Sequence, residues 1–333
     1  MTDEAPVLLE LRGASKRFVK PLDLVDRVSR LLGASVHAET VHAVENVDLQ
    51  VRQGEIVGLV GESGCGKSTL GRLVAGLHTL SAGSRAWRGA DYSGPQARLA
   101  GTAVLPIQMI FQDPYASINP RMRVLDIVGE APVAHGLVPA REQRELVASL
   151  LQQVGLDGSV LMRFPHQFSG GQRARVGIAR ALAVRPEFLV CDEAVAALDV
   201  SIQAQVLKVF LQLRERLRLT YLFISHDLGV VRYLSDRVVI MYLGRVVESA
   251  PADELFGHPN HPYTLGLLRA EPGLEARKRR FIPIQGEIPS PLNPPKGCHF
   301  HPRCEHAQAR CREQAPPLRE IAPGHHSACH LNG

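Results

Sequence analysis

Short apolar segments followed by helical patterns recur along the chain and predict a sheet of mostly parallel strands. An apolar run of four to eight residues is typical of a buried strand, and strands that alternate with helices indicate an α/β fold. The buried strands are expected at 55–60, 107–111, 188–193 and 221–224. Weaker alternation of apolar and polar residues predicts two half-buried strands at 7–12 and 41–51, the first at a sheet edge.

Much of the sequence between these predicted strands has a helical pattern. Residues 70–77 predict the first turns of a helix, and 124–184 is largely helical, with 141–154 strongly amphipathic. Residues 81–100 predict loops, and 19–40 an insertion with a short amphipathic helix. The Pro114 that follows Gln112 and Asp113 marks a boundary before the helical region, because proline disfavours helix at and before it.

A phosphate-binding loop pattern lies between the 55–60 strand and the 70–77 helix. Two glycines separated by four residues precede Lys and Ser, and backbone N–H groups of such a loop, with the helix N-terminus, bind anions. Lys67 would reach the β- and γ-phosphates of a nucleotide, and Ser68 would hold Mg²⁺. A chance match in a glycine-rich turn is the alternative, which the strand and helix context disfavours. The loop consists of Gly61, Glu62, Ser63, Gly64, Cys65, Gly66, Lys67, Ser68 and Thr69.

Two further strands end in polar residues that suit phosphate chemistry. Asp192 and Glu193 follow an apolar strand, and His226 follows the next one. In phosphate-loop enzymes the first acid orders the Mg²⁺ shell and the second polarises the attacking water. Ligand sites of parallel sheets lie at the carboxyl ends of the strands, so these side chains are expected to converge. The ordinary alternative is a solvated strand end.

A second helix start with exposed backbone N–H groups follows the amphipathic helix. Ser169 is a natural N-cap before Gly170, Gly171 and Gln172, and such a start binds anions, although a lone Ser-Gly-Gly is usually a turn. Upstream of the phosphate-binding loop, Phe18 would stack on an adenine ring or belong to the core.

Composition and charge place the chain among ordinary globular proteins. Its 333 residues are 45% hydrophobic and 21% charged, with a formal charge of +5, which does not by itself argue for nucleic acid. No apolar run approaches the ~18 residues that span a bilayer, and the acidic start does not resemble a signal peptide. A cytoplasmic protein is expected.

Four of the six cysteines lie in the last 36 residues, at Cys298, Cys304, Cys311 and Cys329. In a reducing compartment such a cluster indicates a metal before a disulfide. Its spacing matches neither a zinc ribbon nor a ferredoxin, so a four-thiolate site, a zinc site using a nearby histidine and free thiols remain open. The candidate histidine ligands are His299, His301 and His330. The basic run 277–280 predicts a solvated linker, with lipid headgroups or nucleic acid as alternative contacts.

Taken in order, these motifs resemble the ATP-binding cassette (ABC) family of transport ATPases. The likeness covers the whole chain and rests on motifs that are jointly specific. They are GESGCGKS at 61–68, Gln112, FSGGQ at 168–172, CDE at 191–193, ALD at 197–199 and SHD at 225–227. It implies an α/β core over 1–262, with an antiparallel edge and a helical subdomain at about 113–183. Residues 263–333 would form a Cys-rich extension.

The resemblance also implies a role for each motif residue. Phe18 would stack on adenine, Gln112 would sense Mg²⁺ and couple to a membrane partner, Glu193 would be the catalytic base and His226 would contact the γ-phosphate. Ser169, Gly170, Gly171 and Gln172 would bind the nucleotide held by an opposite subunit, and Asp199 would lie in the loop that crosses to it. One copy of each motif then implies a dimer with two composite ATP sites.

A narrower resemblance is to the ATPases of oligopeptide, dipeptide and nickel importers. It rests on GESGCGKST, FQDPYASINPRM at 111–122, SGGQRARVGIARAL at 169–182, HPYTLGLL at 261–268 and the tail segment at 286–304. Ala174, Ala194 and Ala196 depart from the usual Gln, Pro and Ser of this branch. Loss of the Ser hydroxyl beside Leu198 and Asp199 would loosen the cross-subunit contact, but hydrolysis is still expected.

The importer likeness implies partners, a location and a cofactor. These are a second ATPase subunit, two permease subunits and, indirectly, an extracytoplasmic solute-binding protein, at the cytoplasmic membrane face and without nucleic acid. Some ATPases of this branch hold a [4Fe-4S] cluster on their cysteines, with Zn²⁺ as the alternative. An accessory ATPase of a soluble complex such as carbon–phosphorus lyase is a rival, as is a cassette protein acting on ribosomes or DNA. The Cys-rich tail and the single cassette argue against them.

Overall fold

A large mixed sheet forms the centre of the structure. The computed structural model describes residues 5–20, 39–94, 106–112, 118–270 and 284–332. The eight strands run in the order β11-β12-β10-β9-β3-β8-β7-β6, and the five from β9 to β6 are parallel. Their bounds are β3 Ile56–Val60, β6 Ile107–Ile110, β7 Phe188–Asp192, β8 Thr220–Ile224, β9 Arg237–Tyr242, β10 Arg245–Pro251, β11 Arg319–Ala322 and β12 His325–Ser327. The α/β fold class and the four predicted apolar strands are confirmed.

A second sheet is antiparallel, with order β2-β1-β4-β5. Its strands are β1 Val7–Val19, β2 Thr40–Arg52, β4 Ala82–Trp87 and β5 Ala90–Asp91. The edge placement of 7–12 is therefore wrong, because β1 lies between β2 and β4. The loop prediction for 81–100 is also wrong over β4 and β5. Arg85 occupies a buried position of β4, where it donates to the Tyr92 carbonyl oxygen at 2.8 Å. Because a charged residue stands at this inward position, the sequence of β4 does not show the alternation of apolar and polar residues that is typical of a strand.

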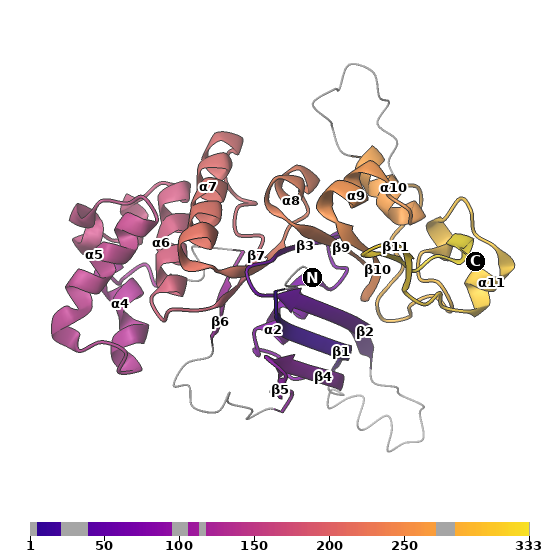
Figure 1. The fold of residues 1–333 in the computed structure, drawn as a ribbon, viewed down its shortest axis with the longest axis horizontal. Helices are drawn as coiled ribbons and strands as arrows, with labels where there is room; N and C mark the ends of the chain where they lie inside the picture. The colour runs from indigo at the N-terminus through magenta and orange to yellow at the C-terminus, as the bar shows by residue number, and fades with distance from the viewer. Residues whose placement is uncertain (1–4, 21–38, 95–105, 113–117, 271–283, 333) are drawn as a thin grey trace, which may run out of the picture.

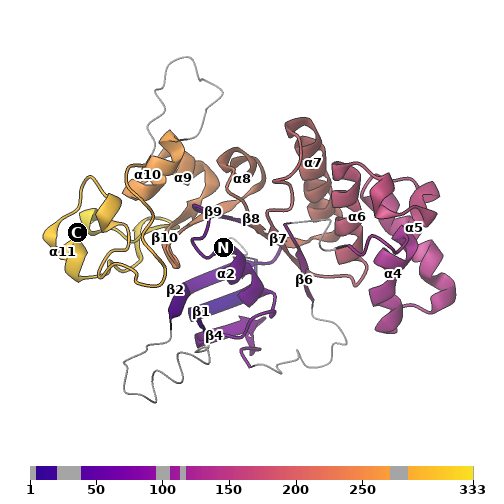
Figure 2. The same ribbon diagram turned by 180° about the vertical axis from the view of Figure 1, so that it is seen from behind.

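Helices pack on the main sheet, and further segments lie beyond each of its ends (Figure 1). Helix α2 packs between the two sheets, with Leu70, Leu73 and Val74 in their shared core. Figures 1 and 2 both place α4, α5 and α6 at one end of the molecule and α11 with the C-terminal segment at the other. The helices are α2 Lys67–Val74, α4 Val124–Ala134, α5 Gln143–Gln153, α6 Gly170–Leu182, α7 Val200–Leu217, α8 Leu228–Leu234, α9 Ala252–Gly257, α10 Pro262–Arg269 and α11 Ala309–Glu313. The described residues also contain the 3₁₀ turns η1 Ala140–Glu142, η2 Gly158–Met162, η3 Pro165–Gln167, η4 His301–Arg303 and η5 His330–Asn332.

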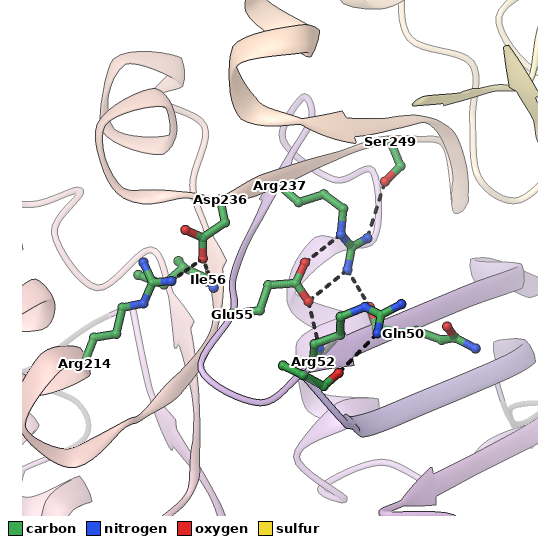
Figure 3. A network of polar contacts seen from close by, with 9 residues as sticks. Gln50, Arg52, Glu55, Ile56, Arg214, Asp236, Arg237 and Ser249 are labelled. Atoms are coloured by element: carbon green, nitrogen blue, oxygen red, sulfur yellow. Dashed lines mark hydrogen bonds and ion pairs between the residues drawn. The ribbon is translucent and has the colours of Figure 1, made fainter. Parts of the chain in front are cut away.

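Ion pairs fix the end of the main sheet opposite the motif residues. Figure 3 shows Arg237, at the start of β9, donating to Glu55 at 2.7 Å and to the Gln50 carbonyl oxygen of β2 at 2.5 Å. Asp236 accepts from the Ile56 N–H at 2.8 Å. These contacts tie the antiparallel sheet to the start of β3, whose other end leads into the phosphate-binding loop.

Strand pairing attaches the C-terminal extension to the core. β12 pairs with β10 through Glu248 and Ser327, so β11 and β12 continue the main sheet. Within the described residues, no helix is long and apolar enough to cross a membrane. Most of the 19–40 insertion, the Asp113–Pro114 boundary and the 277–280 basic run lie outside the described residues.

Candidate active site

The phosphate-binding loop connects β3 to α2 in a backbone shape that requires glycine. Gly64 and Gly66 have φ of 78° and 104°, in the left-handed region that favours glycine. A Cβ on Gly66 would lie 2.1 Å from the Ala43 carbonyl oxygen, and one on Gly61 2.1 Å from that of Met241. The loop therefore packs against β2 and β9, and its glycines leave no space for a side chain there.

Lys67 lies inside the loop rather than on the surface. Its ammonium donates to the carbonyl oxygens of Gly61 at 2.7 Å and Glu62 at 2.9 Å, and the residue is 5% exposed. A cation fixed beside bare backbone N–H groups at a helix N-terminus makes an anion site.

Ser68 and Asp192 form a hydrogen-bonded pair beside Lys67. The Ser68 hydroxyl donates to Asp192 Oδ1 at 2.8 Å, which joins the first turn of α2 to the end of β7. Burial raises the pKa of Asp192, and the Ser68 hydrogen bond opposes this shift. Hydroxyl and carboxylate oxygens are the ligands that Mg²⁺ prefers, so this part of the predicted metal set has the right chemistry.

Glu193 accepts contacts on both carboxylate oxygens. Gln112, next to β6, donates through Nε2 to Glu193 Oε2 at 2.6 Å, and His226 Nδ1, after β8, lies 3.5 Å from Oε1. Glu193 itself has a left-handed φ of 48° at the end of β7. Gln112, Glu193 and His226 therefore converge at the carboxyl ends of adjacent strands. Gln112, expected to sense Mg²⁺, lies here within hydrogen-bond reach of Glu193.

The helix start that was predicted to bind a second anion is capped by its own residues. The Ser169 hydroxyl accepts from the Gln172 N–H at 3.3 Å, and Gln172 Oε1 accepts from the Ser169 N–H at 3.0 Å. This is a capping box, which satisfies two otherwise free donors of α6. Gly170 lies near Leu198, and Gly171 packs against Ile202 of α7.

Two other predicted residues lie at the surface. Phe18 is 38% exposed, and its ring contacts His78 edge-on at 5.4 Å between centroids. It pairs with Val41, two residues along β2 from Ala43, whose carbonyl touches the loop. Asp199 is exposed at the N-cap of α7, and its side chain makes no capping hydrogen bond.

Comparison with known proteins identifies the family. Residues 44–196 match the family model described as "ABC transporter", and 247–311 match "Oligopeptide/dipeptide transporter, C-terminal region". The chain is 47% identical, over 328 residues and 97% of each sequence, to the oligopeptide transport ATP-binding protein AppF of Bacillus subtilis. The chain belongs to the ABC transporter family. A putative peptide import ATP-binding protein of Brucella ovis is 45% identical to this cassette over 324 residues, which is 97% of each chain.

Solved structures agree on the fold of the cassette. The dimeric, ADP- and phosphate-bound cassette MJ0796 aligns with a TM-score of 0.60 at 24% identity, covering 74% of this chain and 99% of that one. CbiO1 from Clostridium perfringens aligns with a TM-score of 0.63 at 24% identity, covering 76% and 92%. These likenesses support the ABC-type fold alone.

The four C-terminal cysteines of the cassette line one small cavity. Cys298, Cys304, Cys311 and Cys329 surround it with His261, His301, His306 and His330. Burial raises the pKa of Cys298 to about 11 and also raises that of Cys304 and Cys329, so these thiols are neutral. Among the described residues, however, no group of three or more His, Cys, Asp or Glu side chains is arranged to hold a metal ion. The donor set suits a soft metal, whereas its geometry is not preorganised for one.

Two residues missed by sequence reasoning contact the phosphate-binding loop of the cassette. Tyr263 and Arg303 both bond to Glu62, from 201 and 241 residues further along the chain. No periodicity or local motif connects residues so far apart.

Proposed function

We propose that this chain is the ATP-hydrolysing subunit that powers an ABC importer for oligopeptides or dipeptides. The observation that carries the proposal is the convergence of Lys67, the Ser68–Asp192 pair and Glu193 at one edge of the parallel sheet. The peptide branch is supported by the relatives named for oligopeptide transport and by the C-terminal family match. Nickel or another small solute is the remaining cargo class.

Each residue then has a separate task in hydrolysis. Backbone N–H groups of the loop and Lys67 bind the phosphates, while Ser68 and Asp192 would hold Mg²⁺, which supplies charge neutralisation. Water attacks the γ-phosphorus, the bond to the β–γ bridging oxygen breaks, and Glu193 accepts the water proton. His226 and Gln112 hold Glu193 from both sides and keep its carboxylate in place.

A dimer with a second ATPase subunit completes two such sites. Ser169, Gly170, Gly171 and Gln172 would contact the nucleotide held by the opposite subunit, with Asp199 in the crossing loop. In support, Ser169 and Asp199 are exposed, and Val200 beside them is 82% exposed. The partner is a homologue or a second copy of the chain.

The remaining partners belong to the membrane. Closure of the ATPase dimer on ATP would be transmitted to two permease subunits through the surface near Gln112. A solute-binding protein would deliver cargo to these permeases. This assigns the chain to the cytoplasmic membrane face as a peripheral subunit, without a nucleic-acid partner.

The cysteine cavity is proposed to hold a [4Fe-4S] cluster, with Zn²⁺ as the alternative. The support is the gathering of four thiols around one cavity, and side-chain movements would be needed to bind metal. Anaerobic purification with iron, sulfide and zinc analysis tests the assignment. About four irons and four sulfides per chain, lost in Cys304→Ser, are expected for the cluster. Absence of both metals would refute it and leave the ATPase assignment unchanged.

The transport function is tested in membranes. The chain, co-expressed with the candidate permeases, should co-purify with them rather than with ribosomes, and peptide with binding protein should stimulate its ATPase activity. Lys67→Ala should abolish that activity. ATP hydrolysis without any membrane partner, together with capture by a soluble enzyme complex, would instead favour the carbon–phosphorus lyase type of accessory ATPase.

A further inference from the structure

The C-terminal extension contacts the phosphate-binding loop at Glu62. Arg303 donates to both carboxylate oxygens of Glu62, from Nη1 to Oε2 at 2.6 Å and from Nη2 to Oε1 at 3.0 Å. The Arg303 side chain is 4% exposed and that of Glu62 is 23% exposed. A two-pronged guanidinium–carboxylate pair shielded from water is stronger and more directional than a surface ion pair.

The backbone of Glu62 is held by the same part of the molecule. Its N–H donates to the Tyr263 hydroxyl at 2.8 Å. Tyr263 is fully buried in the first turn of α10, where its ring packs against Tyr242 at 4.7 Å and Phe300 at 5.4 Å between centroids. The hydroxyl therefore cannot move independently of the aromatic cluster.

Arg303 is also presented from a fixed position. It ends the η4 turn, and its backbone N–H donates to the carbonyl oxygen of buried Phe300 at 3.0 Å. Its Nε donates to the Gln285 carbonyl oxygen at 3.3 Å, and its guanidinium lies 5.9 Å from the centre of the Tyr242 ring. Backbone, side chain and ring contacts all direct the guanidinium toward Glu62.

Glu62 connects these contacts to Lys67. The Glu62 carbonyl oxygen accepts from the Lys67 ammonium at 2.9 Å, so Glu62 accepts from Arg303 and Lys67 and donates to Tyr263. A carboxylate in a loop that binds a triphosphate would repel the ligand if it were unpaired. Arg303 neutralises that charge and fixes its direction.

We propose that Arg303 and Tyr263 are positioning residues for ATP binding, through which the extension neutralises and orients Glu62 in the phosphate-binding loop. This inference rests on the proposed nucleotide-binding role of the loop. It makes the extension part of the nucleotide site rather than an appendage to it.

The test measures MgATP affinity and steady-state hydrolysis in full-length variants. Arg303→Met should raise the Kd and KM for ATP about tenfold or more, with kcat reduced far less, because it leaves a half-buried carboxylate unpaired beside the phosphates. Adding Glu62→Gln to Arg303→Met should restore most of the affinity, because the repelling charge is then absent. Arg312→Met, an exposed arginine of α11, is the matched control and should retain wild-type affinity.

Tyr263→Phe provides a second, milder variant if Arg303→Met folds poorly. Removing only the hydroxyl should raise the KM a few-fold, because the Glu62 N–H loses its partner. Unchanged KM in Arg303→Met and Tyr263→Phe would overturn the inference, as would equal impairment of Arg303→Met and the double variant. Failure of the proposed nucleotide site is a separate result, seen when Lys67→Ala binds ATP as tightly as wild type.

Discussion

Glu193, the proposed base of hydrolysis, lies between a neutral amide donor and an imidazole. Gln112 occupies one carboxylate oxygen and His226 faces the other. Glu193→Gln keeps the size of the side chain but removes its basicity. We expect phosphate release to fall about 10²- to 10⁴-fold, with ATP binding retained, because general base catalysis contributes that range.

Single-turnover phosphate release and size-exclusion chromatography with ATP check this expectation. The Glu193→Gln protein should accumulate as an ATP-bound dimer. Glu215→Gln, an exposed acid on α7, serves as the control and should turn over normally. Equal turnover in Glu193→Gln and wild type would remove Glu193 from the role of base.

Phe18 offers an exposed ring on β1, at the position that pairs with Val41 of β2. Its neighbours Lys16, at 5.2 Å from the ring centre, and His78 leave part of the ring free. If the free part stacks on adenine, Phe18→Ala should weaken ATP binding about tenfold, and Phe18→Tyr should preserve it. Equilibrium binding of a fluorescent ATP analogue measures both. Val19→Ala, at the next and more exposed position, should have no effect; an equal loss in that variant would indicate damage to β1 instead.

At the scale of elements, α6 can approach α7 only because position 171 lacks a side chain. A Cβ on Gly171 would lie 2.3 Å from Cγ2 of Ile202, whereas one on Gly177 in the same helix would meet nothing within 4 Å. Gly171→Ala should therefore destabilise the protein by about 1–3 kcal/mol through overpacking. Gly177→Ala should stabilise it by up to ~1 kcal/mol through helix propensity. Urea unfolding of the two variants tests the pair, and stabilisation by both would contradict the packing argument.

The sequence predicted those elements whose pattern of hydrophobic and polar residues matches the burial of each position in the fold. β3, β7 and β8 are buried on both faces and are continuously apolar, so their existence was predictable. β4 was missed because buried Arg85, whose guanidinium donates to the Tyr92 carbonyl oxygen, occupies an inward position where an apolar residue would be expected. Helix α2 begins three residues before the predicted range and ends at Val74, because Gly76 adopts a left-handed φ of 76°.

The convergence of the site residues was predicted by combining the order of the motifs in the sequence with the rule that ligands bind at the carboxyl ends of parallel strands. Lys67, Asp192 and His226 follow strands that the parallel topology brings to one edge, so their convergence could be expected. The contacts of Glu62 with Tyr263 and Arg303 could not, because a polar pair between distant segments leaves no periodic pattern in the sequence. The spacing of the four cysteines in the sequence likewise did not predict how they are arranged around the cavity.

At the scale of the whole molecule, Glu248 joins the extension to the core. This fully buried carboxylate of β10 accepts from the Asn260 N–H at 2.7 Å, the His261 N–H at 3.0 Å and His325 Nε2 of β12 at 2.7 Å. It thereby fixes both the turn that begins α10 and the strand that carries the extension. Three donors, two of them on buried residues, would lose their partner together in Glu248→Ala.

Loss of those partners should cost about 3 kcal/mol of unfolding free energy, because unpaired buried donors keep their full desolvation penalty. The effect should also be local. Hydrogen exchange of the 319–328 amides should accelerate, whereas β6 at the opposite sheet edge should keep its wild-type rate, because it shares no contact with Glu248. Glu320→Ala removes an exposed carboxylate that accepts a local hydrogen bond from the Gly324 N–H, and it should change stability by less than ~0.5 kcal/mol. Uniform acceleration of exchange in both regions would mean that the extension and the core unfold as one unit, and that Glu248 is not the specific link between them.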